Sequence, residues 1–150
     1  MPIVTIDTIT RPEHLIEFLA DYLRKSDEFE FEYIAKYDER LIPKYPAAHL
    51  QVAGFDKRIH GTHTMLLGMR AAIHVLHANM QQTRATRNYE DLVLATKVVE
   101  YLEEDMTLGD RVIHGFVESE TPGIMPPRVT KGDAITVTRL SWFGIQETRF

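Results

Sequence analysis

Histidines are the residues of this chain whose spacing suggests chemistry. His60 and His63 form one H-x-x-H pair, and His74 and His77 form a second. Imidazole nitrogens are common zinc ligands, so the two pairs suggest a small metal-dependent hydrolase. The run 69–78 is apolar and β-branched and predicts a strand, in which successive side chains point to opposite faces. His74 and His77 then diverge, so we expect no metal site. A centre built from one member of each pair is the alternative.

Two other groups of residues have types suited to catalysis. Thr62 and Thr64 stand beside the first histidine pair, and a hydroxyl next to an imidazole is the minimal activated nucleophile. No G-x-S-x-G motif accompanies them, and His60 and His63 are expected on a flexible loop. The three acids at 103–105 are consecutive, and consecutive helix residues fan out around the axis. We therefore expect a solvated helix end, no catalytic residue and no enzyme.

Composition and motifs exclude several classes of protein. Neither G-x-x-x-x-G-K-[ST] nor G-x-G-x-x-G occurs, so no nucleotide cofactor is expected. The chain has 22 acidic and 17 basic residues without a block of like charge, which argues against sequence-specific binding of nucleic acid. It has no cysteine, so disulfides and thiolate zinc sites are excluded. Without a signal peptide or an apolar run of ~18 residues, the sequence predicts a cytosolic protein with no membrane contact.

Two segments have helical periodicity. The first is expected at about residues 12–25, with Thr10 as the N-cap. The second is expected to begin after Asn88, with Asp91 three residues on, and to end near Gly109. Its predicted apolar stripe comprises Leu92, Ala95, Val99, Leu102 and Met106.

Five segments are typical of strands, and they lie at about 29–34, 49–53, 69–78, 111–118 and 134–145. The polar, glycine-containing segment 57–68 is expected to be a loop, and Pro122, Pro126 and Pro127 indicate an irregular connection. Trp142 is expected in the core, with burial against a partner as the alternative. Hairpin-like neighbours and only two helices predict one α+β domain over residues 1–150. Its sheet would be mixed and largely antiparallel, of about five strands, with two main helices packed on it.

Three segments carry a family resemblance, together with the order of elements over nearly the whole chain. They are 45–52 after the early helix, 102–110 followed directly by the strand 111–118, and the closing run 136–142. In these features the chain resembles the tail-terminator, or tail-completion, proteins of long-tailed bacteriophages. The loop 57–68 and the proline-rich connection 121–128 match no part of that pattern.

The resemblance implies a structural virion protein assembled in the host cytoplasm. Such a protein forms a ring, expected to be a hexamer, on the head-proximal end of the tail tube, where it stops tube polymerisation and joins the tail to the neck. Its partners would be its own copies, the major tail tube protein and the head-completion or neck proteins, and DNA would pass through the ring unread. Ring closure needs a heterologous interface, which we expect at the last strand and the loops. A head-completion or head-to-tail adaptor protein of the neck is the alternative.

Overall fold

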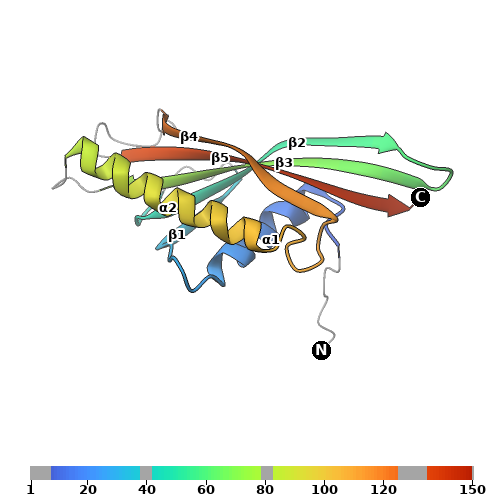
Figure 1. Ribbon diagram of the computed structural model, residues 1–150, viewed down its shortest axis with the longest axis horizontal. Helices are drawn as coiled ribbons and strands as arrows, with labels where there is room; N and C mark the ends of the chain where they lie inside the picture. Colours follow the sequence, from blue (N-terminus) through green and yellow to red (C-terminus); the bar gives the residue numbers. More distant parts are fainter. Residues whose placement is uncertain (1–7, 38–41, 79–82, 125–134, 150) are drawn as a thin grey trace.

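The computed structural model describes residues 8–37, 42–78, 83–124 and 135–149. The elements in this part of the chain are α1 (Pro12–Arg24), β1 (Tyr33–Lys36), β2 (Ala47–Ile59), β3 (Thr64–Ala78), α2 (Arg84–Glu104), β4 (His114–Ile124) and β5 (Ile135–Arg149). The strands form one sheet in the order β1-β2-β3-β5-β4 (Figure 1). Only the pair β1 and β2 is parallel, and the other three pairs are antiparallel. The predicted α+β fold with a mixed sheet is confirmed.

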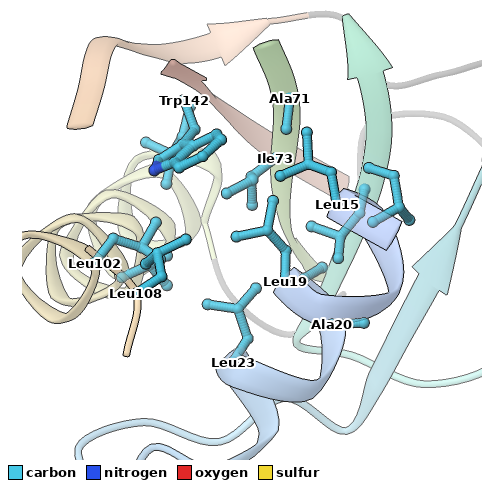
Figure 2. Packing of buried hydrophobic residues seen from close by; sticks show 14 of the residues in the cluster. Leu15, Leu19, Ala20, Leu23, Ala71, Ile73, Leu102, Leu108 and Trp142 are labelled. Carbon is cyan, nitrogen blue, oxygen red and sulfur yellow. The ribbon is translucent and has the colours of Figure 1, made fainter. Parts of the chain in front are cut away.

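Both helices pack on the same face of the sheet and enclose the main core. Figure 2 shows Leu19 and Leu23 of α1 and Leu102 of α2 directed toward Ile73 and Trp142 on the strands. All five side chains are buried, and each large apolar side chain removed from water stabilises the fold by roughly 1.5–3 kcal/mol. The expectation that Trp142 belongs to the core is confirmed.

The indole of Trp142 is seated between two glycines. Gly115 lies on β4, and Gly144 lies two residues after Trp142 on β5. A Cβ atom built on either glycine would overlap the indole ring. Both positions therefore require glycine for close packing rather than for backbone freedom.

The two helices begin at other residues than the sequence predicted. The N-cap of α1 is Arg11, which makes no side-chain capping bond, so the prediction of Thr10 as the cap is wrong. In α2 the hydroxyl oxygen of Thr83 accepts a hydrogen bond from the amide of Thr86 at 3.2 Å. The helix therefore starts before Asn88, through a polar first turn that apolar periodicity does not mark.

The first strand is shorter than predicted because its aromatic residues pack instead of pairing. β1 begins only at Tyr33, while Phe29 and Phe31 lie before it with their rings 5.5 Å apart. Phe29 is buried and also meets the ring of Tyr101 on α2 edge-on at 5.4 Å. The alternation of aromatic and acidic residues thus marks a cluster beneath α2, not a strand.

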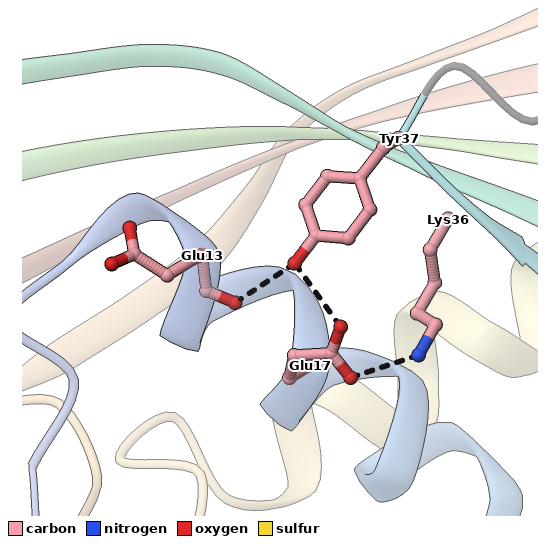
Figure 3. A network of polar contacts seen from close by, with 4 residues as sticks. All are labelled: Glu13, Glu17, Lys36 and Tyr37. Carbon is pink, nitrogen blue, oxygen red and sulfur yellow. Dashed lines mark hydrogen bonds and ion pairs between the residues drawn. The ribbon is translucent and has the colours of Figure 1, made fainter.

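A polar network ties the short β1 to α1 (Figure 3). The ammonium of Lys36 lies 2.8 Å from the carboxylate of Glu17. The hydroxyl of Tyr37 donates to the same carboxylate at 3.1 Å and lies 3.3 Å from the carbonyl oxygen of Glu13. The hydrogen bond from Lys36 is the main cause that lowers the pKa of Glu17. The network fixes the edge strand of the sheet to the helix that covers it.

The last two strands were predicted in place, with shifted ends. β4 starts at His114 and runs through Pro122, which was wrongly assigned to the irregular connection. Proline is tolerated in β4 because it is the edge strand of the described sheet, where proline is commonly found. β5 extends to Arg149, beyond the predicted end. The residues at 126–127 and 134 lie outside the described part of the chain.

The segment 57–68, predicted as a loop, is a β-hairpin. β2 continues through a register shift between Val52 and Gly54, and β3 returns from Thr64, so that 60–63 form the turn. β5 pairs with β3 along the whole hairpin, whereas β4 begins only opposite Ile145. We call residues 55–68 of the hairpin and the paired residues 145–149 of β5 the arm. Figure 1 shows the arm extending past both helices at one end of the molecule.

Candidate functional site

The structure does not gather the four histidines into one site. His60 and His63 are exposed in the turn at the tip of the arm, and His74 and His77 lie on opposite faces of β3, as expected from alternation. The ring of His77 lies 3.0 Å from the carboxylate of Glu90 on α2. Among the described residues, no three histidine, aspartate or glutamate side chains come together in a group that would hold a metal ion.

His74 has a different partner, His49, which the sequence reasoning did not single out. The two residues are opposite each other on β2 and β3, with ring centroids 5.8 Å apart. The Nε2 of His49 lies 2.7 Å from the carbonyl oxygen of Tyr37. Burial, followed by the proximity of His49 and Arg139, lowers the pKa of His74 to about 4. His74 is therefore neutral at pH 7 and packs as part of the sheet face.

Thr62 and Thr64 belong to the turn at the tip of the arm and the start of the strand that follows it. The amides of His60 and Gly61 donate to the carbonyl oxygen of Thr64 at 3.0 and 3.3 Å. Thr62 is exposed in the turn itself. These contacts close the hairpin.

The acids at the end of α2 have separate environments. Glu103 and Glu104 are exposed, and Glu104 is the last residue of the helix, so the predicted end near Gly109 is wrong. Asp105 accepts hydrogen bonds from the hydroxyl of Thr107 at 2.6 Å and from the amide of Gly109 at 2.8 Å. The bond from Thr107 is the main cause that lowers the pKa of Asp105. Its negative charge stabilises the turn after the helix.

Asp91 was interpreted as part of a helix start but is a buried acid. Its side chain faces the sheet beneath α2, where its carboxylate accepts a hydrogen bond from the hydroxyl of Thr138 at 2.8 Å. Burial raises the pKa of Asp91 to about 7. The helical spacing of Asp91 with Ala95, Val98 and Leu102, all buried, is the signal in the sequence that places it inward.

The outer face of α2 is more apolar than its predicted stripe allows. Ala95 and Leu102 are buried as predicted, but Leu92 is on the exposed side. Beside it lie Val93 and Tyr89, whose side chain is 70% exposed. These three residues, with Thr96, Lys97 and Glu100, line a shallow hollow of about 370 Å³. We call this hollow the α2 groove.

The tip of the arm also presents an exposed apolar residue. Ile59 is 76% exposed and pairs across the hairpin with Met65. Lys57 and Arg58 precede it, and both are exposed. Within the described residues β1 pairs with β2 only as far as Leu50, so the outer edge of the arm carries no described strand. Unpaired backbone at a sheet edge is a template for contact with another chain.

Arg70 fastens the base of the arm to the sheet. Its guanidinium lies 5.0 Å from the ring centroid of Phe143 and forms hydrogen bonds of 3.3 and 3.2 Å to the two carboxylate oxygens of Glu118. A hollow of about 570 Å³ begins there and runs along the arm between Lys57, Leu66 and Phe143. Arg70 thus joins the arm to the body by stacking on Phe143 and by a bidentate hydrogen-bonded ion pair with Glu118.

Comparison with models of known protein families and with curated proteins finds no match. In the described part of the chain, neither helix is long and apolar enough to cross a membrane. The arm and the α2 groove are the candidate functional surfaces, identified by their exposure and geometry.

Proposed function

We propose that this chain is the subunit of a ring that caps the head-proximal end of a phage tail tube, ends tube polymerisation and joins the tail to the neck. The observation that carries the proposal is the arm. In the described part of the chain the arm is a three-stranded extension that neither helix covers, with an unpaired backbone edge and an exposed isoleucine at its tip. Such an extension is costly in a monomer and is typical of subunits that contact a neighbour.

The order of elements supports the proposal. A helix precedes the first strands, a second helix ends in a tight turn, and two strands follow, which is the order on which the resemblance to tail-terminator proteins rests. The residues with catalytic side-chain types support it as well. Asp105 holds a turn, His74 packs against His49, and His60 lies in the turn of the arm.

Ring closure requires two different contact patches on each subunit. The arm and the α2 groove satisfy this requirement. A ring is built from two different patches, one on each side of a subunit, whereas a two-fold dimer uses one patch twice. Figure 1 shows the arm at one end of the long axis and the N-terminal half of α2 toward the other. The formal charge of −5 agrees with a channel that lets DNA pass without binding it.

Native mass measurement of the full chain tests the proposal, at increasing protein concentration and with the major tail protein of the same virus. A closed ring, expected to be a hexamer, supports the proposal, and a chain that stays monomeric and never associates with tubes contradicts it. Capture of the portal protein instead of the tail-tube protein would favour the adaptor of the neck.

A further inference from the structure

We propose that the tip of the arm of one subunit docks in the α2 groove of the next copy of the same chain. Ile59 would fill the hollow beside Tyr89, Leu92 and Val93. This inference rests on the proposed ring and names the two surfaces that build it.

The positions of the two surfaces favour contact between copies. The arm and the N-terminal half of α2 lie toward opposite ends of the long axis, so the tip of an arm is remote from the groove of its own chain (Figure 1). A tip on one side and a groove on the other form a head-to-tail pair, which propagates until rotation closes it. One contact type repeated around the ring is then sufficient.

The two surfaces match in polarity. Ile59 and Tyr89 are the most exposed large hydrophobic side chains in the described part of the chain, with 76% and 70% of their surfaces accessible. Burial of this exposed apolar surface in a contact between subunits is favourable in free energy. The convex tip carries an aliphatic side chain, and the hollow of about 370 Å³ is lined by an aromatic ring and two aliphatic side chains. Aromatic residues that line a pocket are typical anchors of interfaces.

The charges around the two surfaces are opposite. Lys57 and Arg58 directly precede Ile59 on the arm. Along α2 from residue 92 to its end, the exposed charges are those of Lys97, Glu100, Glu103 and Glu104, which sum to a negative face. Attraction between a basic tip and an acidic helix raises the rate of association and fixes the register of the contact. The same charges oppose contact between two tips or between two helix faces, which disfavours a two-fold dimer.

Disulfide mapping tests the contact directly, because the chain has no cysteine of its own. Ile59→Cys would be mixed, under a mild oxidant, with each of Tyr89→Cys, Leu92→Cys and Val93→Cys. We expect a covalent dimer in at least one mixture that exceeds the dimer formed by either variant alone. The double variant with that pair should give a covalent species of the mass of the whole ring. Ile113→Cys, another exposed apolar position, replaces Ile59→Cys as the matched control and should give no such product.

Ile59→Asp provides a second readout that does not depend on disulfide geometry. We expect the concentration for half-maximal ring assembly to rise at least tenfold, with an unchanged melting temperature, because the side chain is exposed in the single chain. Ile113→Asp should assemble like the wild type.

The outcomes separate this inference from the proposed function. If the wild type forms rings but Ile59→Asp assembles normally and no mixture cross-links, the docking of arm and groove is wrong and the ring stands. If the wild type forms no ring with or without tail tubes, the proposed function itself fails, and the inference with it.

Discussion

The body and the arm of this protein share strands β2, β3 and β5 but differ in what covers them. In the body, α1 and α2 cover one face, and Ile42 and Tyr45 pack against a small cluster on the other. In the arm the same strands continue past the helices and end in an exposed turn. The body thus contains most of the buried residues that stabilise the fold, whereas the arm, in which Leu67 is buried, carries an exposed apolar side chain, Ile59, at its tip. The predictions below test this division, from the largest expected effect to the smallest.

Trp142→Ala should cause the largest loss of stability. The indole is fully buried between α2 and the sheet, so its removal leaves a cavity, and we expect a loss of about 3–5 kcal/mol in the free energy of unfolding. Ile59→Ala in the arm should change the same quantity by less than about 0.5 kcal/mol, because its side chain is exposed. Urea denaturation of the isolated chain measures both. Similar losses at the two positions would contradict the division.

Asp91 should make the body less stable as pH rises. Its pKa in the folded chain is raised to about 7 from 3.8, so between these values the folded state binds more protons than the unfolded state. The free energy of unfolding therefore falls as pH increases from about 4 to about 7, by up to roughly 4 kcal/mol from this group alone.

His74 affects the pH dependence of stability in the opposite direction, so its contribution must be separated from that of Asp91. Its folded pKa is lowered to about 4 from 6.5, so its contribution to stability is complete above 6.5 and is lost as pH falls toward 4. Urea denaturation at several pH values should show a steeper loss on acidification in Asp91→Asn than in the wild type. His74→Gln should show stability that decreases from pH 4 to 7. Parallel profiles for the wild type and Asp91→Asn would show that Asp91 is not a buried acid.

Glycine substitutions distinguish steric overlap in the body from ordinary van der Waals contact in the arm. Gly144→Ala should lower the free energy of unfolding by about 1–3 kcal/mol, since its Cβ would overlap the indole of Trp142. Gly68 is the matched control in the arm, because its Cβ would meet the ring of Phe143 at an ordinary 3.6 Å. Gly68→Ala should be neutral or slightly stabilising in thermal unfolding. A loss at Gly68 equal to that at Gly144 would place the arm in the close-packed core.

The smallest effect is expected where the arm meets the body. Glu118→Gln weakens a partly exposed ion pair with Arg70, so we expect only a small loss of stability, which diminishes in high salt. Chemical denaturation at low and high ionic strength measures this difference. A loss that is large and independent of salt would indicate that Arg70 fixes the arm more firmly than its exposure suggests.

The sequence predicts the body better than the arm for a physical reason. In the run 69–78 of β3, residues such as Ile73 and Val75 are buried, and the apolar character that burial requires is readable as a strand. The stretch 57–63 has little buried surface, so its polar residues and glycine are typical of a loop. Its residues 57–59 pair with β3 after the turn, and β3 is in turn paired with the distant β5.

The candidate site residues likewise divide into those whose positions the sequence predicts and those whose positions it does not. The divergence of His74 and His77 could be predicted from strand alternation, and the structure confirms it. The partner of His74 could not be derived, because the register between β2 and β3 depends on the shift at Gly54. The inward position of Asp91 was predictable from its spacing with Ala95 and Leu102, but its polar side chain suggested a helix start instead.

Tail-tube elongation observed by electron microscopy tests the central claim most directly. The major tail protein of the same virus would be polymerised with and without this chain. We expect a ring at one end only of each tube, and elongation that stops when the chain is present in amounts far below those of the tube protein. Tubes that grow at an unchanged rate and carry nothing at either end would contradict the proposal that this protein ends a tail.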